Sequence, residues 1–177
     1  MESLTEPRVL RLGFISDTHG HMDDRILYHL EGVDEIWHAG DIGSSQVIDQ
    51  LSLITKVYAV FGNIDSGDIR VNFPEYLHRS LNGLKLMMTH IVGKPGSYTP
   101  TVRNMITAQK PGILVCGHSH IVRVQYDQHF SMLYINPGAA GYHGFHRIRT
   151  LMRLDVSPSG KAENLRVIEL GANKKGA

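Results

Sequence analysis

The chain has 177 residues, and 42% of them are hydrophobic, which is enough for one sizeable core and short for two. A formal net charge of +1 gives no argument for binding nucleic acid or acidic membranes. Its apolar runs fall short of the roughly 20 residues that span a bilayer, and residues 1–8 lack the apolar core of a signal peptide. We therefore expect one cytoplasmic domain over residues 9–171, with tails at 1–8 and 172–177.

The first half of the chain alternates short apolar segments with helical patterns. Strands are predicted at 9–15, 35–39 and 56–61, and helices at 23–30 and after Ser44 or Ser45. Each predicted strand runs into a glycine or serine followed by aspartate or asparagine. Since covered parallel sheets bind ligands beyond the carboxyl ends of their strands, we expect the functional site at these turns.

The second half is expected to be mostly strands. Asn82-Gly83 predicts a hairpin, a Gly- and Pro-rich loop near the active site is expected at 91–100, and a helix passes through Met105. The remaining predicted strands cover 77–81, 84–88, 113–116, 121–126, 130–135, 149–156 and 165–170. Residues 66–76 indicate an irregular surface connection. The alternation of Arg147, Arg149 and Arg153 indicates one solvated face.

Polar side chains with nitrogen or oxygen ligand atoms gather at the predicted strand ends. They are Asp17, His19, Asp41, Asn63, His90, His118 and His120. A set without thiolate suits Mn, Fe, Ni, Co or Zn, and seven ligands fit two ions if one carboxylate bridges them. Two cations roughly 3.5–4 Å apart can clamp the oxygens of a phosphoryl displacement, so the set indicates phosphoester hydrolysis.

The order of these motifs resembles a known family. Asp17-x-His19, Gly40-Asp41, Gly62-Asn63, His90 and Gly117-His118-x-His120 are similar to the motifs of the calcineurin-like metallophosphoesterase superfamily. The compact length resembles its small bacterial phosphodiesterase branch, and residues 135–138 extend the likeness. The resemblance implies an α/β fold with four layers, in which two mixed β-sheets pack as a sandwich flanked by helices.

The resemblance also implies roles for the residues. Asp17, His19 and His120 would hold one metal ion, Asn63, His90 and His118 would hold the other, and Asp41 would bridge them. The expected enzyme is a metal-dependent phosphoesterase, with phosphodiesters favoured over phosphomonoesters and a hydroxide held by both ions as nucleophile. Manganese is the favoured ion, with Ni, Fe, Zn or Co as alternatives, and Asn63 and His90 would also position the phosphate.

Two departures from the family pattern concern the leaving group. Gly62-Asn63-Ile64-Asp65 stands where many relatives have Gly-Asn-His-Glu, and the Gly-Asp-x-x-Asp pattern ends here in Ser44. The histidine that assists the leaving group in those relatives is therefore absent. His143, His146 and His21, in that order, are candidates for a proton donor or phosphate contact. The first two could instead be structural histidines of a tight loop.

Other assignments stay open at this point. Asp65 could orient a ligand or simply close its turn, and His38 is expected to be a strand residue rather than a ligand. A Vps29-like scaffold that binds proteins and keeps a vestigial metal site is the alternative function. A nuclease would need a basic groove that the near-neutral charge does not indicate. The expected partner is a small phosphoester, without nucleic acid or membrane, and a homodimer is compatible with the sequence.

Overall fold

The computed structural model describes residues 8–174, so residues 1–7 and 175–177 of the expected tails lie outside it. Its first sheet has five strands in the order β12-β11-β1-β2-β3. These strands are β1 (Leu10–Ile15), β2 (Glu35–His38), β3 (Lys56–Ala59), β11 (Ile148–Val156) and β12 (Ala162–Ala172). The pairs β1–β2 and β2–β3 are parallel, whereas β11 pairs antiparallel with both β1 and β12.

The second sheet also has five strands, in the order β4-β5-β8-β10-β9. They are β4 (Tyr76–Leu81), β5 (Leu84–Thr89), β8 (Ile113–Val115), β9 (Arg123–Asp127) and β10 (Met132–Asn136). Parallel pairing joins β5, β8 and β10, and the edge strands β4 and β9 run antiparallel to their neighbours. The Asn82-Gly83 hairpin joins β4 to β5 as predicted, because both residues adopt the positive φ that this turn needs.

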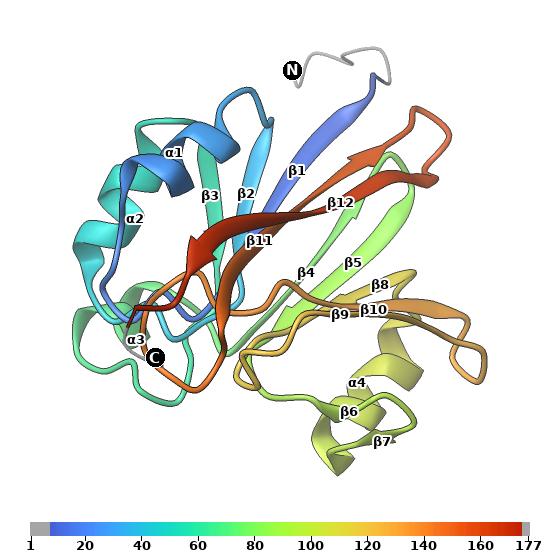
Figure 1. The fold of residues 1–177 in the computed structure, drawn as a ribbon. Coiled ribbons are helices and arrows are strands. Elements are labelled where there is room, and N and C mark those ends of the chain that lie inside the picture. The colour runs from blue at the N-terminus through green and yellow to red at the C-terminus, as the bar shows by residue number, and fades with distance from the viewer. Residues whose placement is uncertain (1–7, 175–177) are drawn as a thin grey trace.

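Helices cover the outer faces of the two sheets (Figure 1). The structure has α1 (Asp24–Leu30), α2 (Ser45–Ser52), α3 (Asp68–Asn72) and α4 (Pro100–Gln109). Asp23 and Ser44 cap α1 and α2 by accepting hydrogen bonds from backbone N–H groups. With α1 and α2 outside the first sheet and α4 outside the second, the predicted four-layer α/β sandwich is confirmed. No helix in residues 8–174 has the length and apolar character to cross a membrane.

The core follows the alternation of side chains along the strands. One face of each sheet contributes to a cluster between the sheets, which includes Leu12, Phe14, Trp37, Met88, Val115, Ile135 and Leu154. Ile15, Ile36 and Leu151 face the other way and pack with α1 and α2. Because both faces of the central strands are buried, these strands read as continuous apolar runs, which is the pattern that identified them.

Two connections differ from the expectation. The segment 66–76 contains the one-turn helix α3, which is too short for a periodic apolar pattern. The Gly- and Pro-rich loop forms a small hairpin of β6 (Gly93–Lys94) and β7 (Ser97–Tyr98) beside α4 (Figure 1). Val92 and Tyr98 are buried in the cluster under α4, so the hairpin packs on that helix, whereas Ile91 at the start of the loop lies in a cavity wall beside His90.

The three arginines on β11 and just before it do not form a solvated face. Arg147 is exposed, but Arg149 is only 1% exposed because the loop after β10 and the start of α1 cover it. Its Nε donates to the carbonyl of Ala140 at 2.6 Å, and its Nη1 lies 2.8 Å from the Asp23 carboxylate and 2.9 Å from the Tyr142 hydroxyl. Arg149 therefore joins β11, α1 and the loop after β10.

We expect Arg149→Ala to lower the free energy of unfolding by about 3 kcal/mol, because it leaves Asp23 without its cationic partner and empties a buried site. Urea denaturation followed by circular dichroism measures this. Arg147→Ala, which removes an exposed guanidinium, is the matched control and should change stability by less than about 0.5 kcal/mol. Equal effects of the two substitutions would contradict the role assigned to Arg149.

Candidate metal centre

The strand ends of both sheets bring the candidate ligands together. The loops after β1, β2 and β3 come from one sheet, and the loops after β5 and β8 come from the other. Asp17, His19, Asp41 and His120 each present a ligand atom, and these atoms all lie within 4.8 Å of one another. Asp41, His90 and His118 form a second such group. Asp41 belongs to both groups, which is the arrangement that a bridging carboxylate requires.

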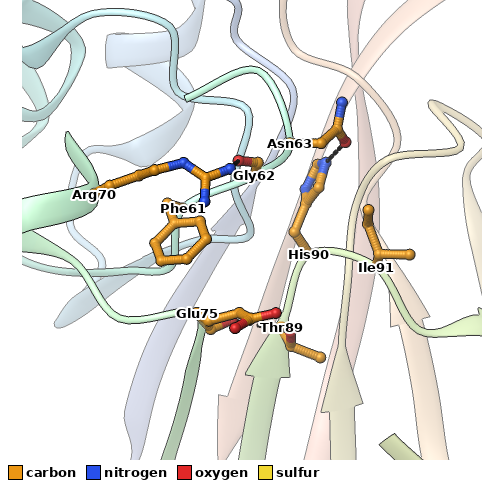
Figure 2. Close-up of a pocket in the computed structure, with 8 residues that line it drawn as sticks. All are labelled: Phe61, Gly62, Asn63, Arg70, Glu75, Thr89, His90 and Ile91. Atoms are coloured by element: carbon orange, nitrogen blue, oxygen red, sulfur yellow. Dashed lines mark hydrogen bonds between the residues drawn. The ribbon is translucent and has the colours of Figure 1, made fainter. Parts of the chain in front are cut away.

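Asn63 adjoins the second group. Its side-chain oxygen Oδ1 lies 2.8 Å from Nδ1 of His118 and 3.1 Å from Nε2 of His90. Figure 2 shows the amide of Asn63 directed at the His90 ring. The structure thus places all seven residues that the sequence singled out around one cluster.

The atoms around His90 fit a bound cation. Its Nδ1 donates to the carbonyl of Ala39 at 2.7 Å, so in the neutral ring the lone pair is on Nε2. That atom faces the Asp41 carboxylate at 3.2 Å and the Asn63 oxygen at 3.1 Å. Although burial lowers the pKa of His90, the hydrogen bond to Asp41 and the charges of Asp17 and Asp41 outweigh it and raise that pKa. The lone pair of Nε2 and those of the two oxygens repel one another unless a proton or a metal ion lies between them. A divalent ion suits this set of donor atoms.

The backbone at the ligands is strained. Nine non-glycine residues in the described chain have positive φ, and five of them are candidate ligands: Asp17, His19, Asp41, His118 and His120. Such conformations cost free energy and persist where the surrounding structure holds them, commonly at functional sites. Here the loops after β1 and β2 hold each other, because the N–H groups of Asp17 and His19 donate to the carbonyls of Gly40 and Asp41 at 3.0 Å.

Asp65 orders two of the ligand loops through their backbones. Its carboxylate accepts hydrogen bonds from the N–H groups of Ile42 at 3.1 Å, Gly43 at 2.8 Å and Gly62 at 2.8 Å. It is 2% exposed and ties the loop of Asp41 to the loop of Asn63. Of the two roles left open, Asp65 thus closes its own turn and also positions a neighbouring ligand loop.

Glycines allow these loops to approach closely. A Cβ at Gly62 would lie 2.1 Å from Oδ1 of Asp41, and a Cβ at Gly117 would lie 2.0 Å from the hydroxyl of Ser16. Any side chain at either position would therefore displace a loop that carries ligands. The glycines that precede Asn63 and His118 in the sequence have this steric reason.

His38 is a buried strand residue, as expected, and it joins two ligand loops. Its Nδ1 accepts from the Gly40 N–H at 3.2 Å, so Nε2 carries the proton and donates to the Thr18 hydroxyl at 2.9 Å. Thr18 in turn donates to the carbonyl of Ile42 at 2.9 Å. The chain of bonds fixes the neutral form of His38, and burial lowers its pKa to about 4. A contact between side chains 20 positions apart has no direct signal in the sequence.

A family comparison agrees with this geometry. The model of the calcineurin-like phosphoesterase superfamily domain matches residues 10–159. The chain belongs to this superfamily.

A relative and two solved structures match this chain over most of its length. A probable metallophosphoesterase of Methanocaldococcus jannaschii is 26% identical over 164 residues, which cover 89% of this chain and 82% of the relative. Vacuolar protein sorting 29 of Cryptosporidium parvum has a TM-score of 0.70 at 22% identity, covering 92% and 98% of the two chains. A predicted phosphoesterase of Streptococcus pneumoniae has a TM-score of 0.62 at 19% identity, covering 91% and 98%.

The remaining histidines near this metallophosphoesterase site differ in availability. The His143 ring is exposed, and its centroid lies 4.5 Å from that of His19. Nε2 of His146 donates to the carbonyl of Gly141 at 3.0 Å, and His21 is bound to Asp23 at 3.0 Å. Ile64, which follows Asn63, is 46% exposed and offers no proton. Among the described residues, neither ring nitrogen of His143 makes a hydrogen bond, and Nδ1 of His146 is buried without a partner.

The pKa of His38 predicts an acid-sensitive fold. Because its pKa falls from 6.5 in the unfolded chain to about 4 in the folded one, the unfolded state binds the extra proton between these values. Stability should therefore fall as the pH drops from 6.5 towards 4. Between pH 7.5 and 4.5 in chelator, wild-type protein should lose about 2 kcal/mol more than His38→Gln, as measured by urea denaturation.

The exposed His78 provides the matched control for that measurement. His78→Gln, which removes an exposed histidine outside the ligand loops, should keep the pH dependence of the wild type. A His38→Gln protein with the unchanged wild-type dependence would contradict the assignment.

Proposed function

We propose that the protein is a phosphodiesterase for small phosphoesters that uses two divalent cations, with manganese favoured. The observation that carries this proposal is the shared position of Asp41, which lies within 4.8 Å of ligand atoms of both groups. Asp17, His19 and His120 would complete one ion site, and Asn63, His90 and His118 would complete the other. The donor set of imidazole, carboxylate and amide oxygen suits a first-row divalent ion.

Two bound divalent cations would supply a nucleophile from water at neutral pH and offset negative charge on the phosphate. The protein's own groups would orient the reaction. Nδ1 of His90 is held by Ala39, which fixes the ring so that Nε2 faces the cluster beside Asn63. Asp65 and His38 hold the loops of Asp41 and Asn63 in place without touching the substrate. Such preorganisation keeps the reacting groups aligned before the substrate binds.

Two cavities beside the cluster support a diester rather than a monoester substrate. One, of about 180 Å³, is lined by Asn63 and His90, and the other, of about 440 Å³, is lined by His118, His120 and His143. The two cavities share no lining residue. A phosphodiester has a substituent for each, whereas a monoester would leave one cavity without a group to bind.

His143 is the group we propose as proton donor to the leaving oxygen. It lines the larger cavity, and its ring lies beside His19 at the edge of the cluster. His146 is less suited, because its proton-bearing Nε2 is already bound to Gly141. The side chain of His143 therefore takes the place of the family histidine that Ile64 replaces.

The test is hydrolysis of bis-p-nitrophenyl phosphate and p-nitrophenyl phosphate by chelator-treated protein to which Mn, Ni, Zn or Mg is returned singly. Turnover restored by a transition metal, with the diester preferred, is the expected result. Preference for the monoester would refute the diesterase assignment. Binding of two ions without turnover of either ester would instead favour the Vps29-like scaffold.

Asp41→Ala should lower kcat/KM for the diester on the order of a thousandfold or more, because one carboxylate serves both ion sites. Calorimetric titration with Mn²⁺ should also give fewer than two ions per chain. Asp49→Ala removes an exposed carboxylate on α2 and is the matched control, for which both readouts should equal those of the wild type. An Asp41→Ala protein that retains wild-type turnover would exclude the bridge.

A further inference from the structure

The cavity beside Asn63 and His90 is lined by both polar and apolar side chains. Figure 2 shows Arg70 and Phe61 on one side, His90 and Ile91 on the other, and Glu75 and Thr89 below. Neither Arg70 nor Glu75 belongs to the two candidate ligand groups. Because Asn63 and His90 line the cavity and also belong to the ion cluster, the cavity opens beside the place where a phosphate would bind.

Arg70 is held with one nitrogen left for a ligand. Its Nε donates to the carbonyl of Asp65 at 2.5 Å, and its Nη2 donates to the carbonyl of Gly62 at 3.3 Å. The guanidinium carbon lies 4.3 Å from the ring centroid of Phe61. Within residues 8–174 the third nitrogen, Nη1, makes no hydrogen bond or ion pair. A preorganised donor therefore borders the cavity.

Glu75 provides an acceptor in the same cavity. Its backbone carbonyl accepts from the Thr89 hydroxyl at 3.0 Å, and the carbonyl of Pro74 accepts from the Phe61 N–H at 3.1 Å. These bonds fix the backbone on which the carboxylate is mounted. Among the described residues the carboxylate has no hydrogen-bond partner and forms no ion pair with Arg70. Both charges thus stay available to an occupant.

The size and the chemistry of the walls define one class of occupant. The volume of about 180 Å³ slightly exceeds the roughly 150 Å³ cavity that admits benzene, so one ring fits. Hydroxyl groups both donate and accept, so a ring with several of them can donate to Glu75 while it accepts from Arg70. Arg70 and Glu75 are exposed side chains, and a hydrocarbon ring would offer no hydrogen bond to Nη1 of Arg70 or to the Glu75 carboxylate. A second phosphate would be repelled by Glu75. Phe61 and Ile91 can cover the C–H faces of the ring.

We infer that this cavity binds a polyhydroxylated ring, a sugar or a cyclitol, esterified directly to the phosphate that the cluster holds. The inference rests on the proposed function in so far as it takes the cluster to be the phosphate site. Glu75 and Arg70 are then specificity-determining residues, which distinguish hydroxylated esters from hydrocarbon esters of the same ring size.

Binding of monophosphates tests the inference independently of turnover. Calorimetry on the Mn²⁺-loaded protein compares myo-inositol 1-phosphate, glucose 1-phosphate and cyclohexyl phosphate, with phosphate release monitored. At least one hydroxylated ligand should bind at least tenfold more tightly than cyclohexyl phosphate, and the tighter of the two identifies a cyclitol or a sugar. Glu75→Gln should reduce this preference to less than threefold, because a charged acceptor for the hydroxyls is lost.

Glu163→Gln, an exposed substitution on β12 far along the chain, is the matched control and should keep the full preference. Equal affinity of the wild type for all three ligands would overturn the inference, and so would an unchanged preference in Glu75→Gln. Hydrolysis of myo-inositol 1-(4-nitrophenyl phosphate) against the cyclohexyl analogue gives the corresponding ratio of kcat/KM. Failure to hydrolyse any diester would refute the proposed function alone, since the binding preference is measured without it.

Discussion

The burial of two carboxylates among imidazoles is the constraint on which the site depends. Asp17 is fully buried and Asp41 is 2% exposed, so bulk water cannot solvate the charge of either carboxylate. Nε2 of His120 lies 3.2 Å from Asp17, and Nε2 of His90 lies 3.2 Å from Asp41. The hydrogen bonds between the loops, the left-handed backbone at five ligands and the close contacts at glycines hold these carboxylates and imidazoles together.

Much of this site could be predicted from the sequence, because an apolar strand followed by glycine or serine and then a polar residue is a local pattern. The same pattern recurs after β1, β2, β3 and β8, and parallel strands bring their carboxyl ends to one edge. The burial of Arg149 could not be predicted in this way, since alternation gives the face of a strand but not what covers it. Asp23, its partner, is 126 positions earlier in the chain.

The residues that line the cavity beside His90 could not be predicted from the sequence for a related reason. Arg70 and Glu75 lie in and just after α3, a segment without apolar periodicity, and their link to the site is made through backbone carbonyls rather than a motif. Asp65 illustrates the same limit, because its three bonds go to N–H groups that every sequence possesses. Much of this site is held in place by hydrogen bonds to backbone groups. Every residue type has these groups, so the sequence does not reveal such bonds.

The distribution of the ligands over both sheets has a consequence for the whole sandwich. Three of the candidate ligands follow strands of the first sheet, and three follow strands of the second: Asp17, His19 and Asp41, and His90, His118 and His120. An ion bound by ligands from both sets would link the two sheets. Separating the sheets would then require release of the ion. By mass action, metal at one hundred times its dissociation constant would add about 2.7 kcal/mol per site to the folded state. The same cations would thus serve the candidate metal centre and raise the thermal stability of the fold.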